Sequence, residues 1–194
     1  MSIKNNSELR IIAGKFRSRK ITFSDAIGLR PTHDRIRETL FNWLNNDIVD
    51  SLCLDCFAGS GALGFEALSR GAKHVTFIEN HKNSINNLKL NAENLKLTSD
   101  EINFICSDFF AINPILLNKQ FDLIFLDPPF KQNLILSAII FLEKNNLLKD
   151  NALIYLEFEK NGFDINSISN NFKIVKHKHT KTIEYALISK IILC

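Results

Sequence analysis

The chain has 194 residues, of which 45% are hydrophobic and 23% are charged. This length and composition fit one domain with an ordinary hydrophobic core, and they exclude a disordered chain. The net charge is +3, but residues 1–46 carry nine Lys or Arg and four Asp or Glu, so that segment is +5 and the rest is −2. A basic segment on a near-neutral body predicts a polyanionic partner, although solvated basic surfaces are also common.

Composition also bears on where the protein works. No apolar run reaches the ~18 residues of a membrane span, and residues 1–8 lack the apolar core of a signal peptide. The four cysteines mostly lie inside apolar runs, which favours buried thiols in a reducing compartment over disulfides. We therefore expect a cytoplasmic monomer that makes no membrane contact.

The first elements expected are two short strands, over residues 9–16 and 20–23, around the basic turn Lys15-Phe16-Arg17-Ser18-Arg19. Arginines with an interleaved aromatic residue are suited to the backbone of RNA. A helix is expected after Arg30-Pro31, because Thr32 is a good N-cap and apolar residues then recur at helical spacing. The candidate RNA-binding residues are Arg10, Lys15, Arg17, Arg19, Lys20, Arg30, Arg35 and Arg37.

From residue 51 onward, strand and helix patterns alternate. Strands are expected over 51–57, 74–79, 102–107, 121–127, 152–158, 172–179 and 183–192, and helices over 61–71, 82–97, 133–147 and 164–170. Alternation with apolar strands predicts an α/β fold, a Rossmann-like and mostly parallel seven-stranded sheet with helices on both faces. The last two strands leave no room for a helix between them, so an antiparallel edge is expected. We divide the chain into a basic N-terminal extension, 1–46, with a β-hairpin and a helix, and a main domain, 47–194.

The stretch from Leu52 to Gly64 combines a strand that ends in Asp55 with a turn that contains Gly59 and Gly61. A glycine turn between a strand and a helix places backbone N–H groups and the positive end of the helix dipole beside a bound ligand. The G-x-G-x-x-G spacing is that of dinucleotide-binding folds. The turn therefore predicts a nucleotide-like cofactor but leaves its identity open.

Polar residues also follow the next two strands. Glu79 lies twenty residues after Gly59, where a carboxylate can accept hydrogen bonds from a ribose diol. Asp108 follows the third strand and could accept from an adenine amino group, with Phe109 against the ring. An Asp at this position is, however, often only a helix cap.

The fourth strand runs into Asp127-Pro128-Pro129-Phe130. Two prolines stiffen the backbone and remove two N–H donors, so carbonyl oxygens face outward as acceptors. Asp127 and the Pro128 carbonyl can accept the two hydrogens of a nucleobase amine, and Phe130 can stack on its ring. Such an amine is a poor nucleophile that two acceptors can aim at an activated methyl group. Transfer of a methyl group from a sulfonium needs no metal. We also expect no metal site at Cys53 and Cys56, since both lie inside an apolar strand.

At these residues the chain resembles the class I S-adenosylmethionine-dependent methyltransferases. The Asp-Pro-Pro-Phe motif is similar to that of enzymes that methylate amines of nucleic acids. More closely, Leu9–Arg19 (LRIIAGKFRSR) and Arg30–Leu44 (RPTHDRIRETLFNWL) resemble the RsmD family. Its members methylate N2 of one guanine in bacterial 16S ribosomal RNA, and the resemblance covers nearly the whole chain.

The resemblance implies S-adenosylmethionine as the cofactor. It implies 16S ribosomal RNA as the partner, within the 30S subunit or an assembly intermediate. The catalytic residues it implies are Asp127, Pro128, Pro129 and Phe130. The cofactor-binding residues it implies are Asp55, Phe57, Ala58, Gly59, Ser60, Gly61, Glu79, Asn80, Ser107, Asp108 and Phe109. Ser18 and Ala13 stand where this family usually has glycine, so the hairpin turn is expected to differ.

Three alternatives stay open on the residues alone. A DNA adenine-N6 or cytosine-N4 methyltransferase would share Asp-Pro-Pro-Phe, but the basic N-terminal segment and the lack of a separate target-recognition domain argue against it. An NAD-dependent oxidoreductase would share the glycine spacing. A non-catalytic RNA-binding chaperone would share only the basic segment.

Overall fold

The structure is a computed structural model that describes residues 6–24, 34–129, 134–168 and 170–191. The strands are β1 (Asn6–Arg10), β2 (Lys20–Ser24), β3 (Leu52–Asp55), β4 (His74–Glu79), β5 (Ile102–Cys106), β6 (Phe121–Leu126), β7 (Leu148–Glu159), β8 (Phe172–His179) and β9 (Ile183–Lys190). The α-helices are α1 (Asp34–Trp43), α2 (Ala62–Ser69), α3 (Lys82–Leu95) and α4 (Leu134–Lys144). Short 3₁₀ turns cover Phe109–Ala111, Pro114–Leu116 and Ile165–Ser167.

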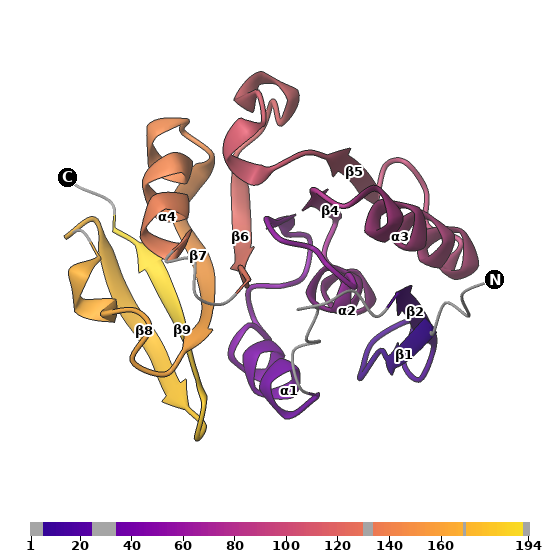
Figure 1. Cartoon of the computed structure of the whole chain (residues 1–194), viewed down its shortest axis with the longest axis horizontal. Helices are drawn as coiled ribbons and strands as arrows, with labels where there is room; N and C mark the ends of the chain where they lie inside the picture. The colour runs from indigo at the N-terminus through magenta and orange to yellow at the C-terminus, as the bar shows by residue number, and fades with distance from the viewer. Residues whose placement is uncertain (1–5, 25–33, 130–133, 169, 192–194) are drawn as a thin grey trace.

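Seven strands form one sheet in the order β5-β4-β3-β6-β7-β9-β8 (Figure 1). The first five run parallel, β9 is antiparallel to β7, and β8 is antiparallel to β9. The predicted α/β fold with an antiparallel edge is confirmed. The helix expected over 164–170 is only a 3₁₀ turn. The Asp164 side chain caps its start by accepting from the Asn166 N–H, and the extended backbone of Ile168 (φ −66°, ψ 139°) ends it.

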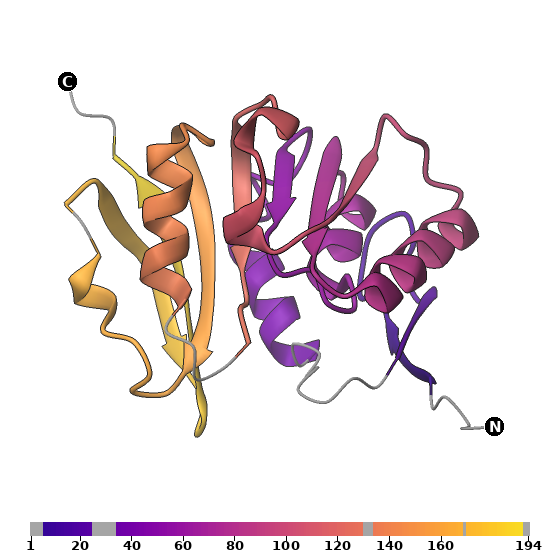
Figure 2. The same cartoon turned by 45° about the horizontal axis from the view of Figure 1, so that its top comes forward.

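Helices cover both faces of this sheet. Apolar side chains of α1, α2 and α3 pack on one face, and those of α4 pack on the other. Figure 2 shows α4 and α1 on opposite sides of the central strands. Because both faces are covered, β4 is buried along its whole length, as expected of a parallel strand.

The N-terminal segment docks on this domain through α2. The buried Glu66 carboxylate accepts from the Ile12 and Ala13 N–H groups, at 2.7 and 3.1 Å. At Gly14 an added Cβ would lie 1.8 Å from the Ser69 carbonyl oxygen, so only glycine allows this close approach. Residues 11–19 therefore form a docked turn between β1 and β2, where strand was expected up to residue 16.

The hairpin and α1 also share the core of the main domain. Buried residues of β1, β2 and α1 belong to the same apolar cluster as Phe65 and Tyr155. The division into 1–46 and 47–194 stays a prediction, since the two parts pack as one body here. Among the described residues no helix is long and apolar enough to span a membrane.

Candidate cofactor and substrate site

The glycine turn joins the carboxyl end of β3 to α2. Gly59 and Gly61 both have positive φ, 51° and 79°, and Gly61 is the N-cap of α2. Gly64 lies in α2 against the Phe77 ring, where an added Cβ would come within 2.2 Å of a ring carbon. Gly61 has no side chain that could cap α2, and a helix N-terminus of this kind suits a polar or anionic group of a ligand. The other predicted turn residues, Phe57, Ala58 and Ser60, lie in this same loop.

Asp55 stands at the start of this turn and is buried. Its Oδ2 accepts from the Gly64 N–H at 3.2 Å. Burial, followed by the nearby carboxylates of Asp127 and Glu79, raises the pKa of Asp55 to about 8. The Gly64 and Phe57 N–H groups act in the opposite direction. The fold thus gathers three carboxylates from the tips of β3, β4 and β6.

Glu79, at the end of β4, is fixed to the glycine turn. Its Oε2 accepts from the Gly59 N–H at 2.9 Å, and its Oε1 accepts from the His81 N–H at 2.8 Å. The His81 Nδ1 lies 3.0 Å from the same Oε1. Asn80, between them, is exposed. Glu79 is therefore oriented beside the loop that would hold a cofactor.

The segment after β5 contains Ser107, Asp108 and Phe109. Asp108 caps the following 3₁₀ turn, since its Oδ1 accepts from the Phe110 N–H at 2.8 Å. Phe109 is buried, and its ring packs on Phe57 with 5.4 Å between centroids. Phe109 thus lies in the core beneath the loop, and the adenine contact expected of this segment stays a prediction.

The β6 tip lies next to the cofactor loop because β6 pairs with β3. Asp127 follows the last paired residue of β6, and its charge acts on Asp55. Pro128 is buried and Pro129 is exposed. Phe130 lies outside the described residues.

The structure adds two residues that sequence reasoning missed, Tyr155 and Glu157 of β7. Both are buried, at 1% and 3% exposure, and the tyrosine hydroxyl donates to Glu157 Oε2 at 2.7 Å. Burial and then the Glu157 and Asp127 carboxylates raise the pKa of Tyr155 well above its ordinary value. Two polar residues at i and i+2 share one face of a strand, and that spacing is the signal that could have revealed them.

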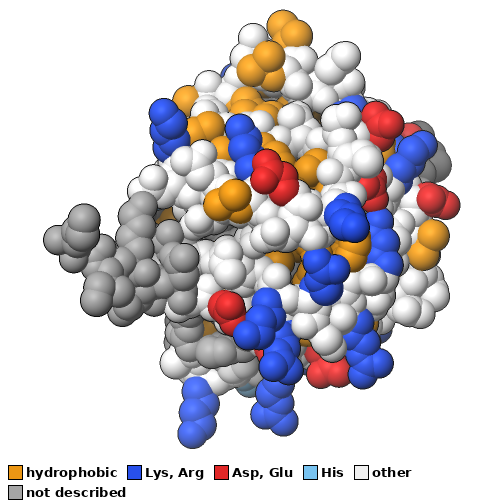
Figure 3. All heavy atoms as spheres, turned by 90° about the vertical axis from the view of Figure 1, so that its right-hand side faces the viewer, with side chains coloured by type: hydrophobic (Ala, Val, Ile, Leu, Met, Phe, Trp, Pro, Cys, Tyr) orange, Lys and Arg blue, Asp and Glu red, His pale blue; other side chains and the backbone are white. Residues whose placement is uncertain are grey.

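The predicted RNA-binding residues that the structure describes are exposed, with the exception of Arg37. Lys15 pairs with Glu101 at 2.6 Å and Lys20 pairs with Glu8 at 2.5 Å, although both lysines are exposed, as are Arg10, Arg17 and Arg35. Figure 3 shows Lys and Arg side chains gathered on the lower half of the face that carries β1 and β2. The exposed Arg19 donates to the Asn94 carbonyl at 2.7 Å, and Arg30 lies outside the described residues.

Among the candidate RNA-binding residues that the structure describes, Arg37 differs from the others because it is fully buried. Its Nη2 donates to the Arg10 carbonyl at 2.9 Å and pairs with Asp34 at 2.6 Å, and its Nη1 lies 3.8 Å from Glu66 Oε2. Its guanidinium therefore holds α1 against β1 and α2 and offers no surface to RNA. Ser18 has φ 65°, so the hairpin keeps at that position the left-handed backbone that glycine favours.

Comparison with known proteins places the chain in a family. A family model described as "Conserved hypothetical protein 95" matches residues 9–189. The chain is 50% identical over 183 residues to "Ribosomal RNA small subunit methyltransferase D" of Haemophilus influenzae, covering 93% of both chains. It is 42% identical to the protein of the same name from Escherichia coli K12, covering 94% of this chain and 90% of that protein.

Solved structures agree with these relatives. The structure of a putative methyltransferase from Escherichia coli matches with a TM-score of 0.83 and 41% identity, over 95% of this chain and 99% of that one. A putative methylase from Haemophilus influenzae matches with a TM-score of 0.79 and 46% identity, over 96% and 100% of the two chains.

Proposed function

The chain belongs to the RsmD family, described as "Conserved hypothetical protein 95", and from this premise we propose that it transfers a methyl group from S-adenosylmethionine to the N2 amine of a guanine in 16S ribosomal RNA. The observation that carries the proposal is the row of adjacent strand tips. Glu79 and Asp55 flank the glycine turn, and Asp127-Pro128 follows on the next strand. One side of the row suits a nucleoside cofactor and the other suits a nucleobase amine.

The residues around the glycine turn fit S-adenosylmethionine better than a dinucleotide. Acidic side chains at three adjacent strand tips would disfavour a pyrophosphate, whereas a cationic methionine end would favour the ionised form of Asp55 and a ribose diol could donate to Glu79. Asp55 and the loop 57–61 would hold the methionine end, and Glu79 would accept from the ribose hydroxyls. The bound cofactor supplies a methyl group activated by its sulfonium. Ser107, Asp108 and the buried Phe109 would border the adenine pocket.

The acceptors at the β6 tip would prepare the nucleophile. Asp127 and the Pro128 carbonyl accept the two hydrogens of the guanine amine and turn its lone pair toward the methyl group. As the new N–C bond forms, the sulfonium sulfur would keep the electron pair of the C–S bond that breaks. The methylated amine then carries a positive charge and loses one proton, which Asp127 would receive. Alignment of this kind lowers a barrier by roughly 7–11 kcal/mol. Stacking of Phe130 on the guanine would add ~1–3 kcal/mol to the binding of the base.

We propose that the ribosomal RNA is held by the basic N-terminal surface. Arg10, Arg17 and Arg35 are exposed residues of this segment, and Lys15, Arg19 and Lys20 are exposed as well. Arginine suits phosphate because its donors form a planar fork. We leave out Arg37 on account of its burial. Whether the substrate is free RNA or an assembled 30S particle is decided by the assay below.

The test is methyl transfer from labelled cofactor to 16S RNA and to 30S particles isolated from cells that lack the enzyme. We expect N2-methylguanosine as the product in nucleoside mass spectrometry. The Asp127→Ala variant should lose transfer by at least a hundredfold and keep cofactor binding in calorimetry. Asp122→Asn, at the opposite end of β6, is the matched control and should retain activity. N6-methyladenine in DNA as the sole product would refute the proposal.

A further inference from the structure

The hairpin of β8 and β9 carries a basic edge that the proposed function does not use. Residues 172–182 contain Lys173, Lys176, Lys178 and Lys181 and no acidic residue. All four lysines are exposed, because β8 is the last strand of the sheet. These lysines are not apparent from the net charge of residues 47–194, because acidic residues elsewhere in that range cancel their charge.

Strand pairing places the tip of this hairpin at the same edge of the sheet as the site. Ile183, the first residue of β9, pairs with Glu159 at the carboxyl end of β7. The Lys160 N–H donates to the Thr182 carbonyl at 3.0 Å, so Lys160 lies beside the tip as well. We call Lys160, Lys176, Lys178 and Lys181 the hairpin patch. β7 adjoins β6, so the patch lies close to Asp127 in the sheet order.

Two lysines of the patch also lie on the same face of the sheet as Tyr155 and Glu157. Cross-strand partners point to the same face. Lys178 pairs with Tyr185, which pairs with Glu157, and Lys176 is joined in the same way through Leu187 to Tyr155.

Trp43 of α1 packs on this face of the sheet. Its ring stacks on Tyr185 with 5.4 Å between centroids, and Lys178 Nζ lies 5.9 Å from the Trp43 ring centroid. His177, between the two lysines, turns to the other face, where its Nε2 lies 3.0 Å from Glu184 Oε2. The two patch lysines therefore face the α1 side, and the nearest acid of β9 is occupied by the histidine.

The charges of the patch are available to a ligand. Among the described residues, none of its four lysines forms an ion pair, in contrast to Lys15 and Lys20 of the N-terminal hairpin. Lysines on an edge strand also discourage pairing with other chains. Edge protection alone gives no reason for lysines in the adjoining loops, at 160 and 181, or for their position at the edge that holds the site.

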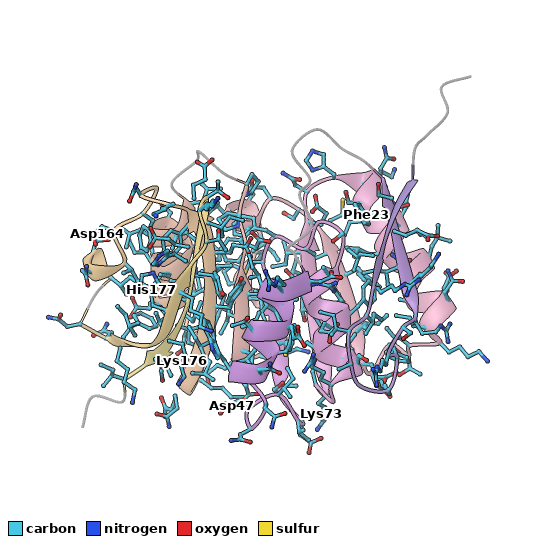
Figure 4. All side chains as sticks on the ribbon, turned by 90° about the horizontal axis from the view of Figure 1, so that it is seen from below. Phe23, Asp47, Lys73, Asp164, Lys176 and His177 are labelled. Carbon is cyan, nitrogen blue, oxygen red and sulfur yellow. The ribbon has the colours of Figure 1, made fainter. Side chains whose placement is uncertain are left out.

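We propose that the hairpin patch is a second contact surface for the phosphates of the ribosomal RNA, on the side of Asp127 opposite to β1 and β2. The proposal rests on the proposed function, because it takes RNA as the substrate. β6 and β8 are three strand spacings apart, ~14 Å. Figure 4 shows Lys176 of β8 and Phe23 of β2 towards opposite ends of the row of strands. An RNA strand with its target guanine at the β6 tip would thus meet positive charge in both directions.

The test compares two triple variants with the same change in charge. The patch variant is K176Q/K178Q/K181Q. The control variant is K73Q/K144Q/K173Q, which removes three exposed lysines at or near the amino ends of β4, β7 and β8, away from the site. RNA affinity is measured by filter binding from 50 to 200 mM salt. The ligand is the one of the two substrates, 16S RNA or 30S particles, that the wild-type protein methylates. Cofactor affinity and the thermal midpoint are measured on both variants.

We expect the patch variant to bind RNA about tenfold more weakly at low salt, with a log–log salt slope reduced by about 2. KM for RNA should rise by a similar factor, while kcat, cofactor affinity and the thermal midpoint stay near wild type. The control variant should keep the wild-type salt slope.

Two outcomes would overturn the proposal, and they are distinguishable. Suppose that the wild-type protein methylates RNA and that the patch variant binds RNA as tightly as wild type, or that both triple variants bind RNA more weakly by the same factor. The patch is then not an RNA contact, while the proposed function stands. If the wild-type protein neither binds nor methylates RNA, the proposed function fails first and the second surface fails with it.

Discussion

Replacing Asp55 by asparagine should stabilise the fold at neutral pH although it removes a residue of the candidate site. The pKa of this carboxyl is about 8 in the folded protein and 3.8 when it is exposed. Because the folded pKa is raised, the stability that Asp55 contributes is fully present below pH 3.8. It is lost as the pH rises toward 8, where the buried group ionises.

The size of the effect follows from the shift. Between pH 4 and pH 8 the folded protein binds one more proton than the unfolded chain, so the free energy of unfolding falls by about 1.4 kcal/mol per pH unit. The loss at pH 7 is about 4 kcal/mol. Asparagine does not titrate, and its Oδ1 can still accept from the Gly64 N–H that Asp55 uses.

The assay is urea unfolding of wild type and Asp55→Asn at pH 5, 6, 7 and 8. The difference in unfolding free energy should grow in favour of the variant with each step. Asp122→Asn controls for loss of a carboxylate in general, since this half-buried residue at the amino end of β6 pairs with Lys149 and accepts from the Leu52 N–H. A difference that stays constant with pH, or an Asp55→Asn variant that is less stable at pH 8, would refute the reasoning.

Three further predictions concern the same region. A cationic cofactor that binds next to Asp55 lowers the pKa of this residue. Calorimetry should therefore show an affinity for S-adenosylmethionine that rises up to tenfold per pH unit from pH 6 to 8 and levels off above pH 8. An affinity that does not change with pH would remove Asp55 from the cofactor site. Gly64→Ala forces a Cβ to within 2.2 Å of the Phe77 ring and should lower the unfolding free energy by about 1–3 kcal/mol in urea, and an unchanged midpoint would contradict this packing. Glu66→Ala removes the buried acceptor of the Ile12 and Ala13 N–H groups and one of the two carboxylates beside the buried Arg37, and it should cost about 3–5 kcal/mol. Proteolysis should then cut the N-terminal hairpin first, and equal resistance of both proteins would count against the docking described above.

Much of the fold follows from short-range patterns in the sequence. Strand and helix periods alternate along the chain, and this alternation has one common solution, a parallel sheet covered on both faces. The glycine turn and Asp-Pro-Pro each act through the backbone of a few adjacent residues, so their positions at strand ends could be predicted without the tertiary structure. The positions of Asp55, Glu79 and Asp127 at the ends of their strands could therefore be predicted from the sequence.

What only the tertiary structure decided depends on burial and on strand order, which are properties of contacts between distant residues. Arg37 lies in a basic segment, but its guanidinium is buried among the Arg10 carbonyl, Asp34 and Glu66. Tyr155 and Glu157 read as ordinary strand residues until β7 is placed beside β6. The lysines of β8 lie about fifty residues after Asp127 in the chain, and the sheet order brings them to within three strands of it. A local pattern specifies the conformation of a segment, whereas charge and burial are set by the segments that pack against it.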